Sequence, residues 1–352
     1  MTESGESGRQ SAILGAFKSL VRMPQPGPPR YGVATRAGLA IAAPLLVLTL
    51  MGHQDIGLQT SAGAFIALFA AQANAKERAK VLPFITLTLF LSAVCGVLLT
   101  PSPWGFAIGL VLVATVSSAL CFGFRIGPPG PVFFVLAYGL ASNVTGIVDG
   151  ERANDPLIFL AAMLGGSLFA YILAVLPVVL PNQRALPARP LSELLPGPWF
   201  GRDELILVVR IAVASIAGTA ISLLWLDQGH AYWTVCSSIA VVGLVGGRHF
   251  SLQRGIHRTI GTLIGALIFM AIAPLGAFPL LLALLIGALQ FTIELVIVRN
   301  YALALMLITP LVLLITTVVA TNSDFVTSAL ERVLDTVVGA ALAILTAFMH
   351  RK

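Results

Sequence analysis

The last apolar stretch of the chain carries three ionisable residues whose spacing could support proton-transfer chemistry. Glu331, Arg332 and Asp335 lie within four positions of one another, so on a helix they share part of one face and can neutralise each other. An ionisable group at the centre of a membrane segment costs about 2.5–3.5 kcal/mol to insert, so such residues usually serve a function. One carboxylate of this group could bind substrate or exchange a proton, with Arg332 tuning it. The alternative is a structural ion pair that fixes the helix.

Other candidates are charged groups near the ends of apolar stretches. Arg258 could face a packed interior, because the Gly261-xxx-Gly265 pair that follows it, with Thr262 between, lets another backbone approach closely. Arg36 and Arg210 begin stretches that match between the two halves of the chain, and we give them the same two interpretations, structural or functional.

Glu294 lies about one turn from Arg299, near the end of its stretch. A solvated pair that reaches the membrane surface is the preferred interpretation, and a functional role is the alternative. Polar residues within two later stretches, Tyr138 and Asn143 in the first half and Thr309 in the second, predict helices that line a pathway.

Basic clusters precede an apolar stretch in each half, and a histidine follows the first stretch of each half. The clusters are Lys76/Arg78/Lys80 and Arg254/His257/Arg258, and the histidines are His53 and His230. The clusters could concentrate anions at the cytoplasmic mouth, although the positive-inside rule alone explains most such clusters. The histidines could sense pH near neutrality, but exposed loop histidines usually have no such role.

The composition is that of a membrane protein. Hydrophobic residues make up 57% of the chain and charged residues 10%, whereas soluble domains carry about 25% charged residues. The apolar stretches lack the period-two alternation of barrel strands, so we expect helices. There are twelve candidate spans: 33–51, 56–74, 79–99, 104–122, 131–148, 156–180, 204–226, 231–247, 256–274, 278–298, 300–320 and 325–349.

The same order of segments occurs twice, offset by roughly 170 positions. We therefore predict an all-α polytopic membrane protein built from two parallel six-helix repeats, as in many transporters. The first repeat covers 31–180 and the second 204–352, joined by a cytoplasmic linker at 181–203. Residues 1–30 form a cytoplasmic segment in which 11–23 could be an interfacial helix or a disordered tail.

The distribution of basic residues predicts the orientation. With a cytoplasmic N-terminus and twelve alternating spans, all of the 21 basic residues except Arg152 and Arg332 lie on the inner side. We therefore expect a multi-pass inner or plasma membrane protein with both termini in the cytoplasm, and the lipid bilayer as a partner.

Several classes of site are not indicated. Cys95, Cys121 and Cys236 lie at no metal-ligand spacing, and we find no nucleotide-binding loop, zinc motif or catalytic triad. We expect no metal, no cofactor and no enzymatic activity. The net charge of +6 follows from topology and does not indicate nucleic-acid binding. The sequence leaves open whether the chain forms a homo-oligomer.

Four motifs in the second half resemble the fusaric acid resistance family of inner-membrane transporters. They are Tyr232-Trp233-Thr234, Arg254-x-x-His257-Arg258-x-x-Gly261-Thr262-x-x-Gly265, Tyr301-Ala302-Leu303-Ala304 with Thr309-Pro310-Leu311, and Glu331-Arg332-x-x-Asp335-Thr336-x-x-Gly339. The resemblance is weaker over 30–180, where Ile56-Gly57 replaces the Tyr-Trp pair. Many family members carry a large cytoplasmic domain after each half, whereas this chain has only the linker at 181–203.

The family includes aromatic-acid exporters and is distantly similar to plant malate-permeable anion channels. The resemblance implies export of a small organic anion, and aromatic carboxylates are the first candidates for the substrate. Coupling to the proton gradient is the economical mechanism, and Asp335 or Glu331 is the expected proton carrier. The alternatives are a passive anion channel, and a membrane assembly factor or polytopic transferase with acidic catalytic residues in its outer loops.

Overall fold

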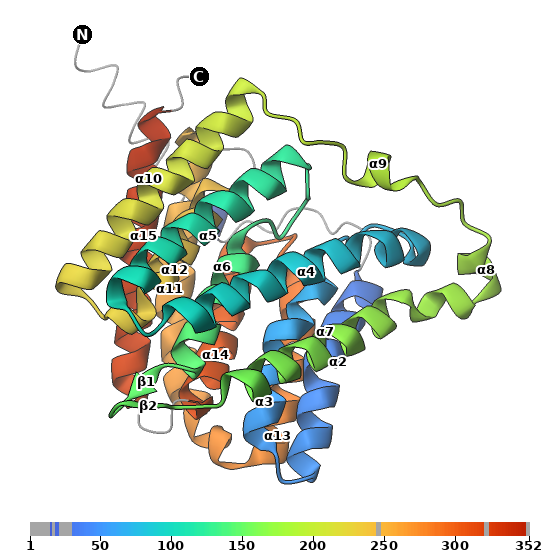
Figure 1. The fold of residues 1–352 in the computed structure, drawn as a ribbon, viewed down its shortest axis with the longest axis horizontal. Coiled ribbons are helices and arrows are strands. Elements are labelled where there is room, and N and C mark those ends of the chain that lie inside the picture. Colours follow the sequence, from blue (N-terminus) through green and yellow to red (C-terminus); the bar gives the residue numbers. More distant parts are fainter. Residues whose placement is uncertain (1–14, 16–17, 21–29, 244–247, 320–323, 350–352) are drawn as a thin grey trace.

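The computed structural model describes residues 15, 18–20, 30–243, 248–319 and 324–349. This part of the chain is a bundle of helices, twelve of them longer than ten residues (Figure 1). The twelve helices are α2 (Tyr31–Leu50), α3 (Gln54–Ala64), α4 (Ala75–Leu99), α5 (Pro103–Gly123), α6 (Val132–Val144), α7 (Pro156–Val175), α10 (Arg202–Trp225), α11 (Ala231–Val242), α12 (Arg248–Ile272), α13 (Pro279–Val296), α14 (Tyr301–Val319) and α15 (Phe325–Thr346). Each predicted span overlaps one of them, and the all-α membrane class is confirmed. Most of the predicted interfacial helix at 11–23 lies outside the described residues.

The prediction of twelve full-length spans needs correction. By length and composition, eight helices of the described chain can cross a membrane, and α6 is a shorter apolar helix of 13 residues. Helices α3 and α11 have only 11 and 12 residues, which is about half the thickness of the hydrocarbon core. Both are surrounded by other helices, and all twelve residues of α11 are buried. Short buried helices at membrane depth are typical of transporters that bind substrate near the midplane.

Short polar sequences set where several helices begin. The Asn74 side chain accepts a hydrogen bond from the backbone N–H of Glu77, and the Glu77 carboxylate accepts one from the backbone N–H of Asn74, so the two form a capping box. Asp155 and Asp324 cap α7 and α15 in the same way through one side-chain oxygen. These caps satisfy backbone N–H groups that the first helical turn leaves without partners.

Smaller elements occupy the connections. After α6, a hairpin of β1 (Ile147–Val148) and β2 (Glu151–Arg152) replaces the last residues of the predicted span 131–148. Asp149 and Gly150 both have positive φ, as a two-residue hairpin turn requires. The remaining short elements are η1 (Phe65–Leu68), η2 (Leu176–Val179), α8 (Pro181–Arg184), α9 (Leu191–Leu194), η3 (Gln228–His230), η4 (Ala273–Ala277) and η5 (Ala347–Met349).

Two ends of the bundle are used as landmarks below. The linker end carries the connection from α7 to α10 with α8 and α9, and the hairpin end carries β1 and β2 (Figure 1). Helix α12 begins at the linker end, whereas α11 and α15 begin at the hairpin end.

Helices at matching positions of the two halves pack in the same way. In the first half α3 packs on α2 and α7, and α4 on α6; in the second half α11 packs on α10 and α15, and α12 on α14. The two halves also contact each other, because α2 packs on α13 and α10 packs on α5 (Figure 1). This correspondence is what the predicted duplication would produce, and the duplication itself stays a prediction.

Glycine permits a close helix contact at matching positions of the two halves. A Cβ on Gly166 of α7 would lie 2.1 Å from the Thr60 carbonyl oxygen of α3, and a Cβ on Gly339 of α15 would lie 2.3 Å from the Thr234 carbonyl oxygen of α11. Real Cβ atoms do not approach backbone so closely, so any other residue would push the helices apart. Small residues allow the same close approach in membrane helix pairs generally.

Gly165 and Gly166 provide a test of this packing. We expect Gly166→Ala to destabilise the protein by about 1–3 kcal/mol, because the new methyl group overlaps the backbone of α3. Gly165→Ala is the matched control, since a Cβ there meets nothing within 4 Å. Thermal unfolding of the two purified variants in detergent measures the difference, and equal stabilities would contradict the packing described here.

Candidate functional site

The four sequence motifs of the second half converge on one set of buried side chains between α11, α12, α14 and α15. On α15, Arg332, Asp335, Thr336 and Gly339 recur at helical spacing and are all buried. Helix α15 packs on both α11 and α12, and α12 packs on α14. The buried face of α15 therefore lies against the Tyr232-Trp233-Thr234 motif and near Arg258.

Asp335 is held by hydroxyl groups. The Asp335 residue is only 2% exposed, and the Thr234 hydroxyl donates a hydrogen bond to its Oδ1 at 2.6 Å. The Thr234 oxygen also lies 3.2 Å from the Ser222 hydroxyl of α10. Among the described residues no basic group lies within 4.0 Å of Asp335, so the mutual neutralisation that sequence spacing suggested for Arg332 and Asp335 does not form a direct ion pair.

Arg332 lies near this carboxylate, and a second buried arginine, Arg258, lies near Arg332. The Arg332 guanidinium lies 5.0 Å from the centre of the Trp233 ring, in a cation–π arrangement. In the described part of the chain its Nε and Nη1 have no hydrogen-bond partner, and neither has Nε of Arg258. Arg258 donates from Nη1 to the Tyr301 hydroxyl at 3.0 Å. The two guanidinium groups are close enough to repel each other.

A cavity of about 640 Å³ opens at the linker end beside these residues. Arg254, His257, Asn300 and Tyr301 are among the side chains that line it. The Arg254 guanidinium lies 4.1 Å from the centre of the Tyr301 ring. Because Tyr301 also bonds Arg258, it stands between the cavity and the buried arginines.

A third cluster lies at the hairpin end. The His230 ring stacks on Trp233 with 4.2 Å between centroids. Its Nδ1 lies 2.9 Å from Asp227 Oδ2 and 3.2 Å from Glu331 Oε2. The hydrogen bond with His230 lowers the pKa of Asp227 below its ordinary value. Glu331 therefore faces His230 and is separate from the buried pair of Arg332 and Asp335, which corrects the expectation of one shared cluster.

These groups follow one another in a series across the second half. From the linker end it runs through the cavity, Arg254 with Tyr301, and Arg258 to Arg332 and Asp335, and it ends at the His230 cluster. Arg258 and Asp335 both lie near the middle of their helices. The series therefore spans the depth of the bundle.

The first half has no such series. Counting back from the packing glycine by four and seven residues gives Asp335 and Arg332 on α15, but Ala162 and Phe159 on α7. On the partner helix, Thr60 matches Thr234 at this contact, so Leu58-Gln59 stands where the second half has Tyr232-Trp233, and the alignment of Ile56-Gly57 with that pair is corrected by two positions. The two halves share a helix contact, and the ionisable residues occur in only one of them.

Arg210 and Glu294 have structural surroundings that the sequence did not indicate. Arg210 is fully buried and donates to Ser251 Oγ at 3.1 Å and to the Ala343 carbonyl at 3.2 Å, so it joins α10, α12 and α15. Glu294 is buried and accepts from Gln290, and its nearest basic groups include Arg36 of α2. The predicted solvated pair with Arg299 is therefore wrong.

The remaining candidates are mostly packing residues by position. Tyr138 stacks on Phe106 and donates to its carbonyl at 2.7 Å, so its hydroxyl is already satisfied in the core of the first half. Thr262 and Thr309 are buried where α12 meets α14, and Asn143 is half-buried at the end of α6. His53 is exposed, unlike His230.

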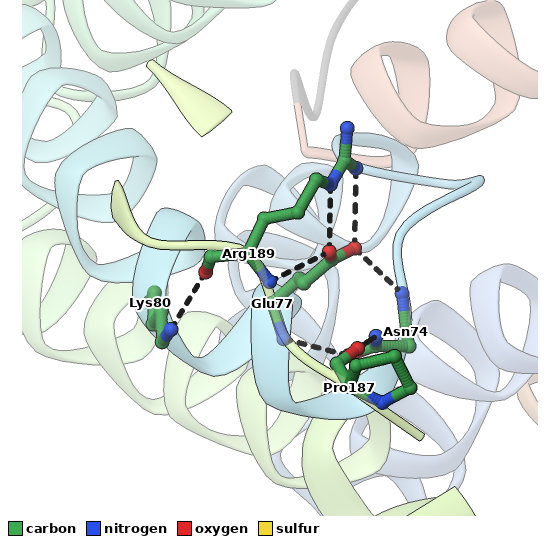
Figure 2. Close-up of polar contacts among 5 residues, drawn as sticks. All are labelled: Asn74, Glu77, Lys80, Pro187 and Arg189. Atoms are coloured by element: carbon green, nitrogen blue, oxygen red, sulfur yellow. Dashed lines mark hydrogen bonds and ion pairs between the residues drawn. The ribbon is translucent and has the colours of Figure 1, made fainter. Parts of the chain in front are cut away.

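Two lysines in the first turns of α4 bind the linker, and Figure 2 shows Lys80 with its linker partner. Lys80 donates to the Arg189 carbonyl at 2.7 Å, and Lys76 donates to the Leu186 carbonyl at 3.2 Å. Glu77 accepts from the backbone N–H of Arg189 at 3.2 Å and from its Nε at 2.8 Å, which raises the pKa of Arg189. Sequence analysis missed this contact and left the lysines with two interpretations, attraction of anions or the positive-inside rule.

Comparison with known proteins matches the second half of the chain, which holds these residues. Residues 207–346 match the family described as "Fusaric acid resistance protein-like". A relative, "Uncharacterized membrane protein YvaC" of Bacillus subtilis (strain 168), is 32% identical over 143 residues, which are 41% of this chain and 22% of the relative. The chain thus aligns with about a fifth of the relative's length. No solved structure matches. The resemblance is confirmed over the part of the chain that holds the site.

Glu77→Gln tests how the linker is held. Loss of the carboxylate charge weakens the bond to Arg189, so trypsin should cleave the linker after Arg184 roughly two to five times faster, as expected for a pair worth up to about 1 kcal/mol. Limited proteolysis of the purified protein measures the rate. Glu193→Gln changes a linker carboxylate that does not hold Arg189 in this way, and it should leave the rate unchanged; equal rates in all three proteins would argue against the anchor.

Proposed function

We propose that the chain is a membrane transporter of small organic anions. The premise is that residues 207–346 match the fusaric acid resistance protein-like family. Its path would follow the series of polar residues between α11, α12, α14 and α15. One observation carries the proposal: Arg258 and Arg332 are buried near mid-bundle, and no carboxylate of the described residues forms an ion pair with either.

The argument for an anion is electrostatic. A buried charge without a partner is strongly unfavourable, and an oppositely charged group offsets much of that cost. A guanidinium group binds a carboxylate through two parallel N–H donors, and donors of this kind on both arginines have no acceptor among the described residues. A substrate carboxylate would supply the acceptors.

Aromatic side chains around the arginines favour an aromatic substrate. Trp233 and Tyr232 are fully buried beside Arg332, and Tyr301 contacts Arg258. Aromatic rings pack against one another in offset or edge-to-face arrangements and contribute about 0.5–1.5 kcal/mol beyond area burial. A ring bearing a carboxylate would satisfy both features of this site.

Asp335 offers a link to protons. A bound carboxylate and an ionised Asp335 would repel each other across Arg332, so the anion binds more favourably when Asp335 is protonated. Substrate and proton would then enter and leave in a coupled manner. This mechanism assigns Asp335 the role of proton carrier and leaves Glu331 at the hairpin end, paired with His230. Outward export is the direction that the family resemblance favours.

A passive anion channel is the second candidate, because the polar series spans the bundle and its basic groups would also attract a permeating anion. Uptake of labelled 4-hydroxybenzoate into proteoliposomes separates the two, with the pH gradient and membrane potential set independently. Accumulation above equilibrium only with a pH gradient supports the coupled carrier. Flux that follows only the anion gradient and the potential supports the channel.

Asp335→Asn should abolish accumulation driven by a pH gradient, because the amide cannot exchange a proton at this position. Exchange of labelled for unlabelled substrate should persist, since that reaction needs no net proton movement. Asp324→Asn is the control, because Asp324 is an exposed carboxylate that caps the same helix. Proton-driven accumulation that continues unchanged in Asp335→Asn, at normal expression, would remove the assigned role.

Arg332→Gln and Arg258→Gln should each weaken substrate binding by at least about tenfold, because a hydrogen bond to a charged group contributes about 1.5–3 kcal/mol. Calorimetry on the purified protein measures the dissociation constant. Arg202→Gln, an exposed residue at the start of α10, is the matched control. Unchanged affinity in both buried variants would mean that the arginines serve the fold and do not bind substrate.

A further inference from the structure

The hairpin-end cluster brings together three side chains that can bind a metal ion. One ligand atom each from Asp227, His230 and Glu331 lies within 4.8 Å of the others, and Nδ1 of His230 is 2.9 Å and 3.2 Å from the two carboxylate oxygens. Zinc binds imidazole nitrogen and carboxylate oxygen at about 2.0–2.2 Å, so ligand atoms around it are roughly 3.0–3.5 Å apart. The two nitrogen–oxygen distances are close to that spacing.

Hydrogen bonding within the cluster cannot satisfy all three groups. Nδ1 of His230 can carry only one proton, whereas two carboxylates face it. The carboxylates of Asp227 and Glu331 also repel each other. A divalent cation would accept electron pairs from the nitrogen and both oxygens and would cancel the repulsion.

The three side chains are held in place by different parts of the fold. His230 stacks on Trp233, Glu331 projects from α15, and the other oxygen of Asp227 accepts from the backbone N–H of Gly229 at 2.7 Å. Side-chain exposures of 19% for His230, 42% for Asp227 and 28% for Glu331 leave access for an ion and for water. Ligands positioned in advance in this way favour binding.

We propose that Asp227, His230 and Glu331 form a binding site for a first-row divalent metal ion, with Zn²⁺ as the test ion and water completing its coordination. One imidazole and two carboxylates suit zinc, whereas magnesium and calcium prefer ligand sets made of oxygen alone. Sequence spacing could not indicate this site, because Glu331 lies about a hundred residues from the other two ligands.

The ion would connect η3 to α15 at the hairpin end of the polar series. If that series is the transport path, bound Zn²⁺ would hold this end closed and slow transport, and this consequence alone rests on the proposed function. Binding of the metal is measured without transport, so the two proposals can fail separately.

Titration of Zn²⁺ into the full chain in detergent, after removal of metal with EDTA, tests the site. We expect one saturable site per chain that raises the apparent melting temperature as the concentration of Zn²⁺ increases, with no effect of Mg²⁺. His230→Phe keeps a ring on Trp233 but removes the ligand atom, and Glu331→Gln removes a charge; each should weaken Zn²⁺ binding by at least about tenfold. His53→Phe is the matched control and should bind like the unaltered protein.

No saturable binding in the unaltered protein, or undiminished binding in both variants, would overturn the site. Co²⁺ gives a second readout that does not depend on how the variants fold: the unaltered protein should show a d–d absorption band that EDTA abolishes, and absence of the band overturns direct coordination. Zn²⁺ that binds without slowing 4-hydroxybenzoate uptake would overturn only the closure. Failure of uptake in every condition would count against the proposed function and leave the metal site standing.

Discussion

The second half of the protein depends on the close approach of α15 to α11 at Gly339. The Thr234 carbonyl occupies the space that any larger residue at position 339 would need. Since Asp335 precedes Gly339 by one helical turn, this contact places its carboxylate against the Thr234 hydroxyl. A further turn away, Arg332 lies over the Trp233 ring. The site therefore exists because two backbones meet where one side chain is absent.

A second constraint is the cost of charge inside an apolar bundle. Arg210 meets it through hydrogen bonds to Ser251 and the Ala343 carbonyl, so it stabilises the packing of three helices. Arg258 and Arg332 meet it only in part, through Tyr301 and the Trp233 ring. Buried groups that the fold leaves incompletely satisfied are where binding of a ligand contributes most free energy. Of these arginines, Arg332 has the larger number of donors without a partner among the described residues, at Nε and Nη1.

The two halves differ in chemistry more than in architecture. Both contain a short buried helix that contacts a glycine of the sixth helix, at Gly166 and at Gly339. Only the second half adds ionisable side chains at the positions that this contact brings together. The basic residues at the linker end also have different surroundings in the two halves. Lys76 and Lys80 bind the linker, whereas Arg254 borders a cavity. Similar sequence clusters thus have different neighbours.

Sequence by itself determined the helical class, the position of each helix and the four motifs, since hydrophobic stretches and family patterns are local properties of the chain. It also identified Asp335, Arg332 and Arg258, because a charge within an apolar stretch is visible without a structure. Tertiary structure decided the partners. Thr234 donates a hydrogen bond to Asp335 across 101 positions, and Glu331 lies against His230 instead of joining Arg332 and Asp335 as the spacing had predicted. Helical periodicity predicts which face a residue occupies, but the neighbour on that face and the depth in the bundle follow only from how the helices pack.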